Sequence, residues 1–178
     1  MVASISPSYQ TGRVELGKVL PLHTPFLVYL DVSEVCNFRC KYCFRGSDQA
    51  GDGYCFNSGI MEWDTFVLAA DQLGEFPEQV KKISLSNQGE PLVNRKLPDM
   101  VRYIKCHDYS RVVEIHTNAS LLDRDYVLDL ADSGIDRVIV SLQGLSAEQY
   151  RKNCGVEIDY NDMVENITLF YNSKKDNT

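Results

Sequence analysis

Residues 26–44 read Phe-Leu-Val-Tyr-Leu-Asp-Val-Ser-Glu-Val-Cys-Asn-Phe-Arg-Cys-Lys-Tyr-Cys-Phe, an apolar run followed by three closely spaced cysteines, Cys36, Cys40 and Cys43. The whole chain has six cysteines, so this stretch holds half of them. Thiols this close together indicate a soft-metal site, a redox pair or a disulfide framework. A cubane iron–sulfur cluster normally takes four thiolates. Three would leave one iron open to a small molecule, as a catalytic zinc site keeps an open position.

The apolar residues 26–30 predict a short buried strand whose carboxyl end leads into the cysteines. Parallel α/β folds place ligand sites at this end of their strands. Farther along, strands alternate with helical apolar patterns, which predicts βαβ units and a parallel sheet. The further strands are predicted at 83–86, 112–116 and 138–140, and helices at 62–73, 97–104, 126–131 and 160–171. Gly74, Gly134, Ser146 and Asn161 are expected as helix caps.

The spacing Cys-x3-Cys-x2-Cys, with Tyr42 directly before Cys43, resembles the signature of the radical S-adenosylmethionine (SAM) superfamily. The resemblance implies a 4Fe–4S cluster on Cys36, Cys40 and Cys43, with SAM bound at the open iron. It also implies reductive cleavage of SAM to a 5′-deoxyadenosyl radical that abstracts hydrogen from substrate. The residues around the loop, Phe38 and Tyr42, are expected to pack against it, with Tyr42 near the adenine.

The resemblance also sets the expected fold class and domain organisation. It implies an α/β, partial (β/α) TIM-like barrel with parallel strands, of which this chain would hold about four of six βα units. Residues 1–25 are expected to form an N-terminal arm and residues 26–178 a radical SAM core domain truncated at its C-terminus. Residues 19–26 look like the segment that precedes the core in members with a SPASM domain, which modify peptides or other small metabolites.

Three further motifs follow the predicted strands. Residues 87–92, Asn-Gln-Gly-Glu-Pro-Leu, resemble the family's Gly-Gly-Glu-Pro motif, so Gly89 and Glu90 are expected to receive the SAM amino group, while Gln88 replaces the first glycine. Asn118 matches the family's Thr-Asn-Gly segment near the ribose and methionyl parts of SAM. Residues 141–144, Ser-Leu-Gln-Gly, look like the family's Ser-Leu-Asp-Gly segment, and this resemblance implies that Ser141 offers a hydroxyl near SAM. Each motif alone is also compatible with an ordinary turn.

Other polar and sulfur-containing residues receive plainer interpretations. His116, at the end of a predicted strand, is expected to be packed or solvated. Cys55 lies in a predicted loop and is expected to be a free thiol. Cys106 and Cys154 have no partner at ligand spacing and are expected to be structural or surface thiols.

Composition narrows the possible partners and compartment. The chain has 178 residues and a formal net charge of -7, which argues against a nucleic-acid partner. No stretch approaches the ~20 apolar residues of a membrane helix, and the N-terminus lacks a secretory pattern. A cytoplasmic location is therefore expected, and there clustered cysteines are more often metal ligands than disulfides.

The sequence thus predicts the core of a radical SAM enzyme acting on an unidentified peptide or small metabolite. Its cluster would need a low-potential electron donor, such as flavodoxin or ferredoxin. Two alternatives remain open at this point. One is a non-catalytic iron–sulfur or zinc-binding module, and the other is a truncated chain that folds poorly and has no activity.

Overall fold

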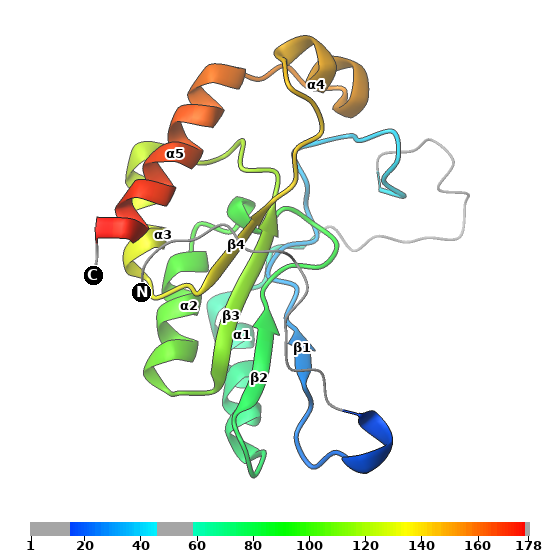
Figure 1. Cartoon of the computed structure of the whole chain (residues 1–178), viewed down its shortest axis with the longest axis vertical. Helices are drawn as coiled ribbons and strands as arrows, with labels where there is room; N and C mark the ends of the chain where they lie inside the picture. Colours follow the sequence, from blue (N-terminus) through cyan, green and yellow to red (C-terminus); the bar gives the residue numbers. More distant parts are fainter. Residues whose placement is uncertain (1–14, 46–58, 177–178) are drawn as a thin grey trace.

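The computed structural model describes residues 15–45 and 59–176, in which four strands form one parallel sheet. The strands lie side by side in chain order (Figure 1), and they are β1 (Leu27–Tyr29), β2 (Val80–Ser84), β3 (Ser110–Thr117) and β4 (Arg137–Val140). The predicted α/β class and parallel sheet are therefore confirmed. The interpretation of Cys55 and of the first 14 residues of the arm lies outside the described residues.

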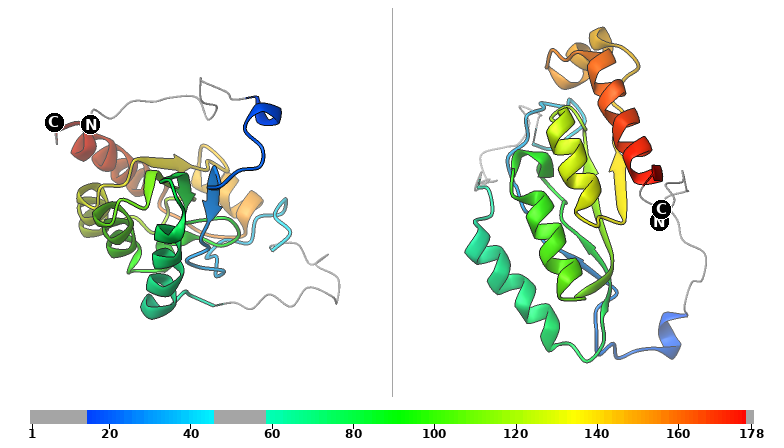
Figure 2. Two further views of the ribbon diagram at one scale, coloured as in Figure 1. Left: turned by 90° about the horizontal axis from the view of Figure 1, so that it is seen from below. Right: turned by 90° about the vertical axis from the view of Figure 1, so that its left-hand side faces the viewer.

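Five α-helices follow the strands. They are α1 (Trp63–Asp71), α2 (Leu97–Cys106), α3 (Arg124–Asp132), α4 (Ala147–Cys154) and α5 (Tyr160–Asp176), and the 3-10 turns are Leu16–Lys18, Gln72–Glu75 and Pro91–Val93. Helices α1, α2, α3 and α5 cover one face of the sheet, whereas α4 lies beyond the carboxyl ends of the strands (Figures 1 and 2). Among the described residues, no helix has the length and apolar character needed to cross a membrane.

The main core lies between the sheet and its helical layer. Alternate strand residues such as Ile83, Val113 and Ile115 are fully buried there, against helix residues such as Phe66 and Leu130. Neighbouring residues along a strand point to opposite faces. The residues between these core positions therefore lie on the face that the helices leave uncovered.

The bounds of β2 differ from the prediction of 83–86. The strand begins at Val80 and ends at Ser84, because Lys82 is accommodated within it by an ion pair with Glu114 of β3, at 2.7 Å. From the sequence alone, a lysine within a short apolar run suggests a loop, because the acidic residue that will pair with it lies far away in the sequence. The physical pairing, and not the apolar pattern, sets the start of this strand.

Two helix ends also differ from the prediction, and one agrees. Helix α1 ends at Asp71, and Gly74 lies within the 3-10 turn that continues it, so Gly74 is not the cap. The side chain of Asp159, not that of Asn161, accepts hydrogen bonds from the first turn of α5, at 3.0 Å. Ser146 caps α4 as predicted, since its side chain accepts from the backbone N–H of Gln149.

Candidate functional site

The three cysteines lie in the segment that leaves the carboxyl end of β1. The backbone N–H of Phe38 donates to Cys36 Sγ at 3.5 Å, and the backbone N–H of Cys43 donates to the carbonyl of Cys40 at 3.0 Å. These local bonds fold the segment into tight turns. Cys36, Cys40 and Cys43 are all half-buried free thiols, so each remains partly accessible to a ligand.

The thiols influence one another electrostatically. Burial raises the pKa of Cys36, and Glu90 and the other two cysteines raise it further. Burial and a hydrogen bond with the Cys154 thiol raise the pKa of Cys40 to about 11, although a hydrogen bond from Tyr42 acts in the opposite direction. Without a metal, the raised pKa values of Cys36 and Cys40 keep these two thiols protonated at neutral pH. A metal group that binds here must displace them, as thiol ligation normally requires.

A second, smaller core packs against this cysteine segment. Phe38 is only 4% exposed and packs edge-to-face on Tyr150 of α4, with ring centroids 5.9 Å apart. Met163 of α5 completes the cluster. The expectation that Phe38 packs around the loop therefore agrees with its burial. Tyr42, in contrast, is 67% exposed and touches the loop through its hydroxyl.

Cys154 was expected to be a structural or surface thiol. It is fully buried in the second core, and its thiol is hydrogen-bonded with that of Cys40. Its carbonyl also accepts from the backbone N–H of Arg39 at 2.9 Å. Gly155, directly after Cys154, ends α4 with a left-handed φ of 66°. A glycine at this position is a sequence signal for the end of a helix, where the chain turns. Nothing in the sequence indicated the partner.

The Gly89–Glu90 loop is joined to the segment that precedes Cys36. The backbone N–H of Glu90 donates to the carbonyl of Val35 at 2.9 Å. At Gly89, an added Cβ would lie 2.1 Å from the carbonyl oxygen of Ser33. Only glycine permits this approach, which gives the glycine of the motif a structural reason.

The Glu90 carboxylate lies between β2 and β3. Glu90 is only 2% exposed. Its Oε1 accepts hydrogen bonds from the backbone N–H of Leu92, at 3.1 Å, and from the Thr117 hydroxyl. Its Oε2 accepts a hydrogen bond from the backbone N–H of Asn118 at 2.8 Å. Burial raises the pKa of Glu90, and these three donors oppose the rise. They occupy three of the roughly four acceptor positions of a carboxylate. One position on Oε2 is left for a further donor.

Asn118 connects the end of β3 with the cysteine segment. Its Nδ2 donates to Oδ1 of Asn37 at 2.9 Å, and its Oδ1 accepts from the Ser120 hydroxyl at 2.8 Å. Asn37 in turn donates to the Ser120 hydroxyl at 2.8 Å. Asn37 lies between the first two cysteines, so this network positions Asn118 beside them. Asn118 was predicted from the sequence, whereas Asn37 and Ser120 were not.

The remaining residues of the sequence analysis lie around this centre. Ser141 follows β4, and its backbone N–H donates to the carbonyl of Thr117 at 2.9 Å. Gln88, which replaces a glycine of the motif, accepts from Arg45 at 3.2 Å. His116 is 52% exposed on its side chain, in agreement with a solvated position. The structure thus brings the cysteine segment, Glu90 and Asn118 together. Ser141 is connected to this group by the backbone hydrogen bond to Thr117.

Thiolate ligands suit both a single soft metal ion and an iron–sulfur cluster. Within residues 15–45 and 59–176, no three His, Cys, Asp or Glu side chains are grouped so that they could hold one ion. A structural zinc ion requires such a group. A cubane cluster instead spreads its thiolates over separate iron atoms, so its ligands need not converge on one point. Three mutually interacting thiols at the strand ends fit that group.

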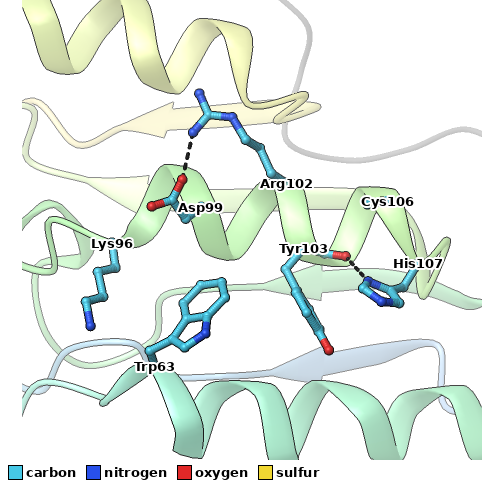
Figure 3. A pocket seen from close by; sticks show the side chains of 7 residues that line it. All are labelled: Trp63, Lys96, Asp99, Arg102, Tyr103, Cys106 and His107. Atoms are coloured by element: carbon cyan, nitrogen blue, oxygen red, sulfur yellow. Dashed lines mark hydrogen bonds and ion pairs between the residues drawn. The ribbon is translucent and has the colours of Figure 1, made fainter.

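The hollows in the described part of the chain include one near the cysteine segment and one away from it. One of about 460 Å³ lies between α1 and α2 on the helical side of the sheet (Figure 3), and is lined by Trp63, Lys96, Asp99, Arg102, Tyr103, Cys106 and His107. The other, of about 340 Å³, is lined in part by Asn37, Phe38 and Ser120. The second hollow therefore borders the cysteine segment, whereas the first does not.

A family model described as the Radical SAM superfamily matches residues 30–178. The chain belongs to the radical SAM superfamily. Enzymes of this superfamily use a 4Fe–4S cluster and SAM. The predicted family is thereby confirmed, while the SPASM subgroup stays a prediction.

Curated relatives match the chain over part of their own length. The tungsten-containing aldehyde ferredoxin oxidoreductase cofactor-modifying protein of Pyrococcus furiosus is 34% identical over 124 residues, which is 68% of this chain and 32% of that protein. A probable GTP 3',8-cyclase of Methanopyrus kandleri is 31% identical over 140 residues, 79% of this chain and 41% of that protein. This radical SAM chain therefore spans about a third to two-fifths of the length of these relatives.

Solved structures share the fold at low identity. SuiB of Streptococcus suis bound to SAM has a TM-score of 0.65 at 19% identity, over 90% of this chain and 34% of that chain. BtrN in complex with SAM has a TM-score of 0.60 at 20% identity, over 79% of this chain and 51% of that chain. The likeness confirms the barrel-type arrangement of the radical SAM fold for the four βα units.

Proposed function

We propose that this chain is the core of a radical SAM enzyme that holds a 4Fe–4S cluster on Cys36, Cys40 and Cys43 and binds SAM at the open iron. The observation that carries the proposal is the hydrogen-bonded assembly of the cysteine segment, Glu90 and Asn118 at the strand ends. When bound, the cluster supplies the electron that cleaves SAM to a 5′-deoxyadenosyl radical.

The side chains have distinct roles in this proposal. Glu90 accepts the SAM ammonium on the remaining acceptor position of Oε2, in a buried setting where charge-assisted hydrogen bonds are strong. Asn118, held by Asn37, presents its amide near the ribose and methionyl parts. Ser141 contributes its hydroxyl from the neighbouring strand. Tyr42, whose ring is exposed, lies near the adenine.

The relatives and structural neighbours suggest a class of substrate, and the reduction of SAM requires an electron donor. Structural neighbours include SuiB bound to its precursor peptide, and relatives include GTP 3',8-cyclases. We infer a peptide or a small metabolite as substrate of this chain. Because the sulfonium is hard to reduce, an external low-potential protein such as flavodoxin or ferredoxin supplies the electron.

Anaerobic reconstitution with iron and sulfide tests the proposal. The expected result is a cluster whose electron paramagnetic resonance signal changes when SAM is added, followed by formation of 5′-deoxyadenosine under a chemical reductant. Cys36→Ala is the negative variant and Cys106→Ala, at an exposed position on α2, is the matched control. A cluster whose spectrum ignores SAM would support the non-catalytic module instead.

A further inference from the structure

The last turn of α4 lies alongside the cysteine segment and is joined to it by two backbone hydrogen bonds. The N–H of Arg39 donates to the carbonyl of Cys154 at 2.9 Å. The N–H of Lys41 donates to the carbonyl of Asn153, also at 2.9 Å. Backbones joined by such bonds in a sheet lie about 5 Å apart, and a disulfide needs a Cα–Cα separation of about 4.4–6.8 Å. Because the two bonds flank Cys40, the backbone spacing there suits a covalent link to Cys154.

The thiols of these two residues are already in contact. The Cys40 thiol is hydrogen-bonded with the Cys154 thiol, and the hydroxyl of Tyr42 is hydrogen-bonded with both. The effect of Cys43 on Cys40 is electrostatic and smaller. Cys154, which is distant in sequence, is therefore a closer partner for the Cys40 sulfur than Cys43 of the same segment.

The two thiols differ in accessibility. Cys154 is fully buried in the second core, together with Phe38, Tyr150 and Met163. Cys40 is half-buried and packs against the outside of that core. A small disulfide in solution can therefore reach Cys40 but not Cys154. Redox-sensitive sites often combine an accessible thiol with a neighbouring resolving thiol, and this pair has that arrangement.

We propose that Cys40 and Cys154 form a reversible disulfide that closes the cysteine segment to the cluster. The inference rests on the proposed function in one respect, because it takes Cys40 to be a cluster ligand. The Cys40 thiolate first attacks a low-molecular-weight disulfide, which yields a mixed disulfide and releases one small thiol. Cys154 then attacks the Cys40 sulfur and releases the second small thiol. The two protein thiols are oxidised, the small disulfide is reduced, and both protons leave on the released thiols.

The disulfide and the cluster exclude each other. A metal ligand must be a thiolate, and the Cys40 sulfur is no longer one when it is bonded to Cys154. Cys36 and Cys43 would remain, so that one of the three proposed ligands is missing. A small thiol in excess drives the same exchange backwards and restores the third ligand. The disulfide also protects the cluster-free segment, because a thiol that is oxidised to the sulfinic level is lost irreversibly.

Incubation of the full, cluster-free chain with oxidised glutathione tests the pairing. After free thiols are blocked with iodoacetamide, trypsin cleaves after Arg39 and after Lys41, which separates Cys40 from the other cysteines of the segment. Mass spectrometry without reductant should show residues 40–41 in a disulfide with residues 153–174. Because burial raises the pKa of Cys40, little thiolate is present at neutral pH, and the incubation extends over hours.

Iron loading of the same samples tests the consequence. After reconstitution without a thiol reductant, the iron bound per chain should fall in proportion to the linked fraction, and prior treatment with dithiothreitol should restore it. Cys154→Ala lacks the resolving thiol, so oxidation should stop at a glutathione adduct on residues 40–41. Its reduced form should bind as much iron as the parent chain. Cys106→Ala, which removes an exposed thiol on α2, should behave like the parent chain throughout.

The outcomes separate this inference from the proposed function. A disulfide confined to residues 36–43, or none, in a parent chain that binds iron when reduced would overturn the pairing alone. The expected link in a chain that binds no iron after reduction would uphold the pairing and overturn the proposed function.

Two further results would overturn the exclusion of the cluster by the disulfide. One is unchanged iron loading of the linked parent chain. The other is lower iron loading in reduced Cys154→Ala with the circular dichroism spectrum of the parent chain, which would make Cys154 itself a ligand. If Cys154→Ala does not fold, the link and its reversal in the parent chain decide the question without it.

Discussion

Replacement of Gly89 by alanine is expected to disrupt the junction between the Glu90 loop and the cysteine segment. The new Cβ would lie 2.1 Å from the carbonyl oxygen of Ser33 and 2.8 Å from the carbonyl carbon of Glu34. Ordinary C···O contacts are about 3.3 Å or longer, so the two backbones must separate by about 1 Å. Neither neighbour is a flexible side-chain end that could simply rotate away.

The cost follows from the bonds that this separation stretches. The backbone bond from Glu90 to Val35, at 2.9 Å, would be lost together with close packing, which we expect to lower the free energy of unfolding by about 2–4 kcal/mol. Displacement of Glu90 would also remove the charge-assisted contact with the SAM ammonium that we propose for it. Affinity for SAM should fall by about 10- to 100-fold.

Urea unfolding of the chain and SAM titration of the reconstituted chain measure the two effects. Gly59→Ala is the matched control, because Gly59 accepts a hydrogen bond from Glu34 of the same segment and no described atom lies within 4 Å of its added Cβ. Its unfolding free energy should change by less than about 1 kcal/mol. If Gly89→Ala unfolded at the same urea concentration as Gly59→Ala with an equal slope, the close approach would be refuted.

Three further outcomes are expected. Cys36→Ala should lower the iron and sulfide bound per chain after reconstitution, and Cys106→Ala should not; equal loading in both would exclude Cys36 as a ligand. Burial raises the pKa of Glu90, so the affinity for SAM should begin to decline, as the pH falls, at a pH above the usual pKa of a glutamate. Glu90→Gln should abolish this pH dependence. If the pH profile of the variant matched that of the parent chain, Glu90 would have no part in SAM binding. Hydrogen bonds from two tyrosine hydroxyls lower the pKa of Asp71, so its stabilising contribution is present above the unfolded-state pKa and is lost as pH falls through the folded-state pKa. Acid unfolding should show this loss in the parent chain and not in Asp71→Asn.

Much of the fold could be predicted because its signals are local. The four strand–helix units follow from apolar periodicity, and Ser146 caps α4 as its position before the helix indicates. The misplaced start of β2 has a non-local cause, since Lys82 is stabilised by Glu114 on the neighbouring strand. Periodicity within one segment carries no information about such a partner.

The candidate site divides in the same way. The cysteines and Glu90 occur in short contiguous motifs, so the resemblance of these motifs to those of the family was enough to predict them. Asn37 contacts Asn118 across 81 positions of sequence, and Cys154 meets Cys40 only because α4 returns to the cysteine segment. These contacts arise from the packing of separate units against one another. They required the three-dimensional structure.

Under the proposed function, the hydrogen bonds at the strand ends would make cluster binding and SAM binding mutually dependent. Val35 precedes Cys36 directly, and its carbonyl accepts from the backbone of Glu90. Any displacement of the cysteine segment therefore moves Glu90, the proposed partner of the SAM ammonium. Glu90 in turn accepts from Asn118, which is bound to Asn37 in the same segment. Because this circuit is closed, ordering the cysteine segment on a cluster also orders the residues proposed for SAM, and linkage requires the converse.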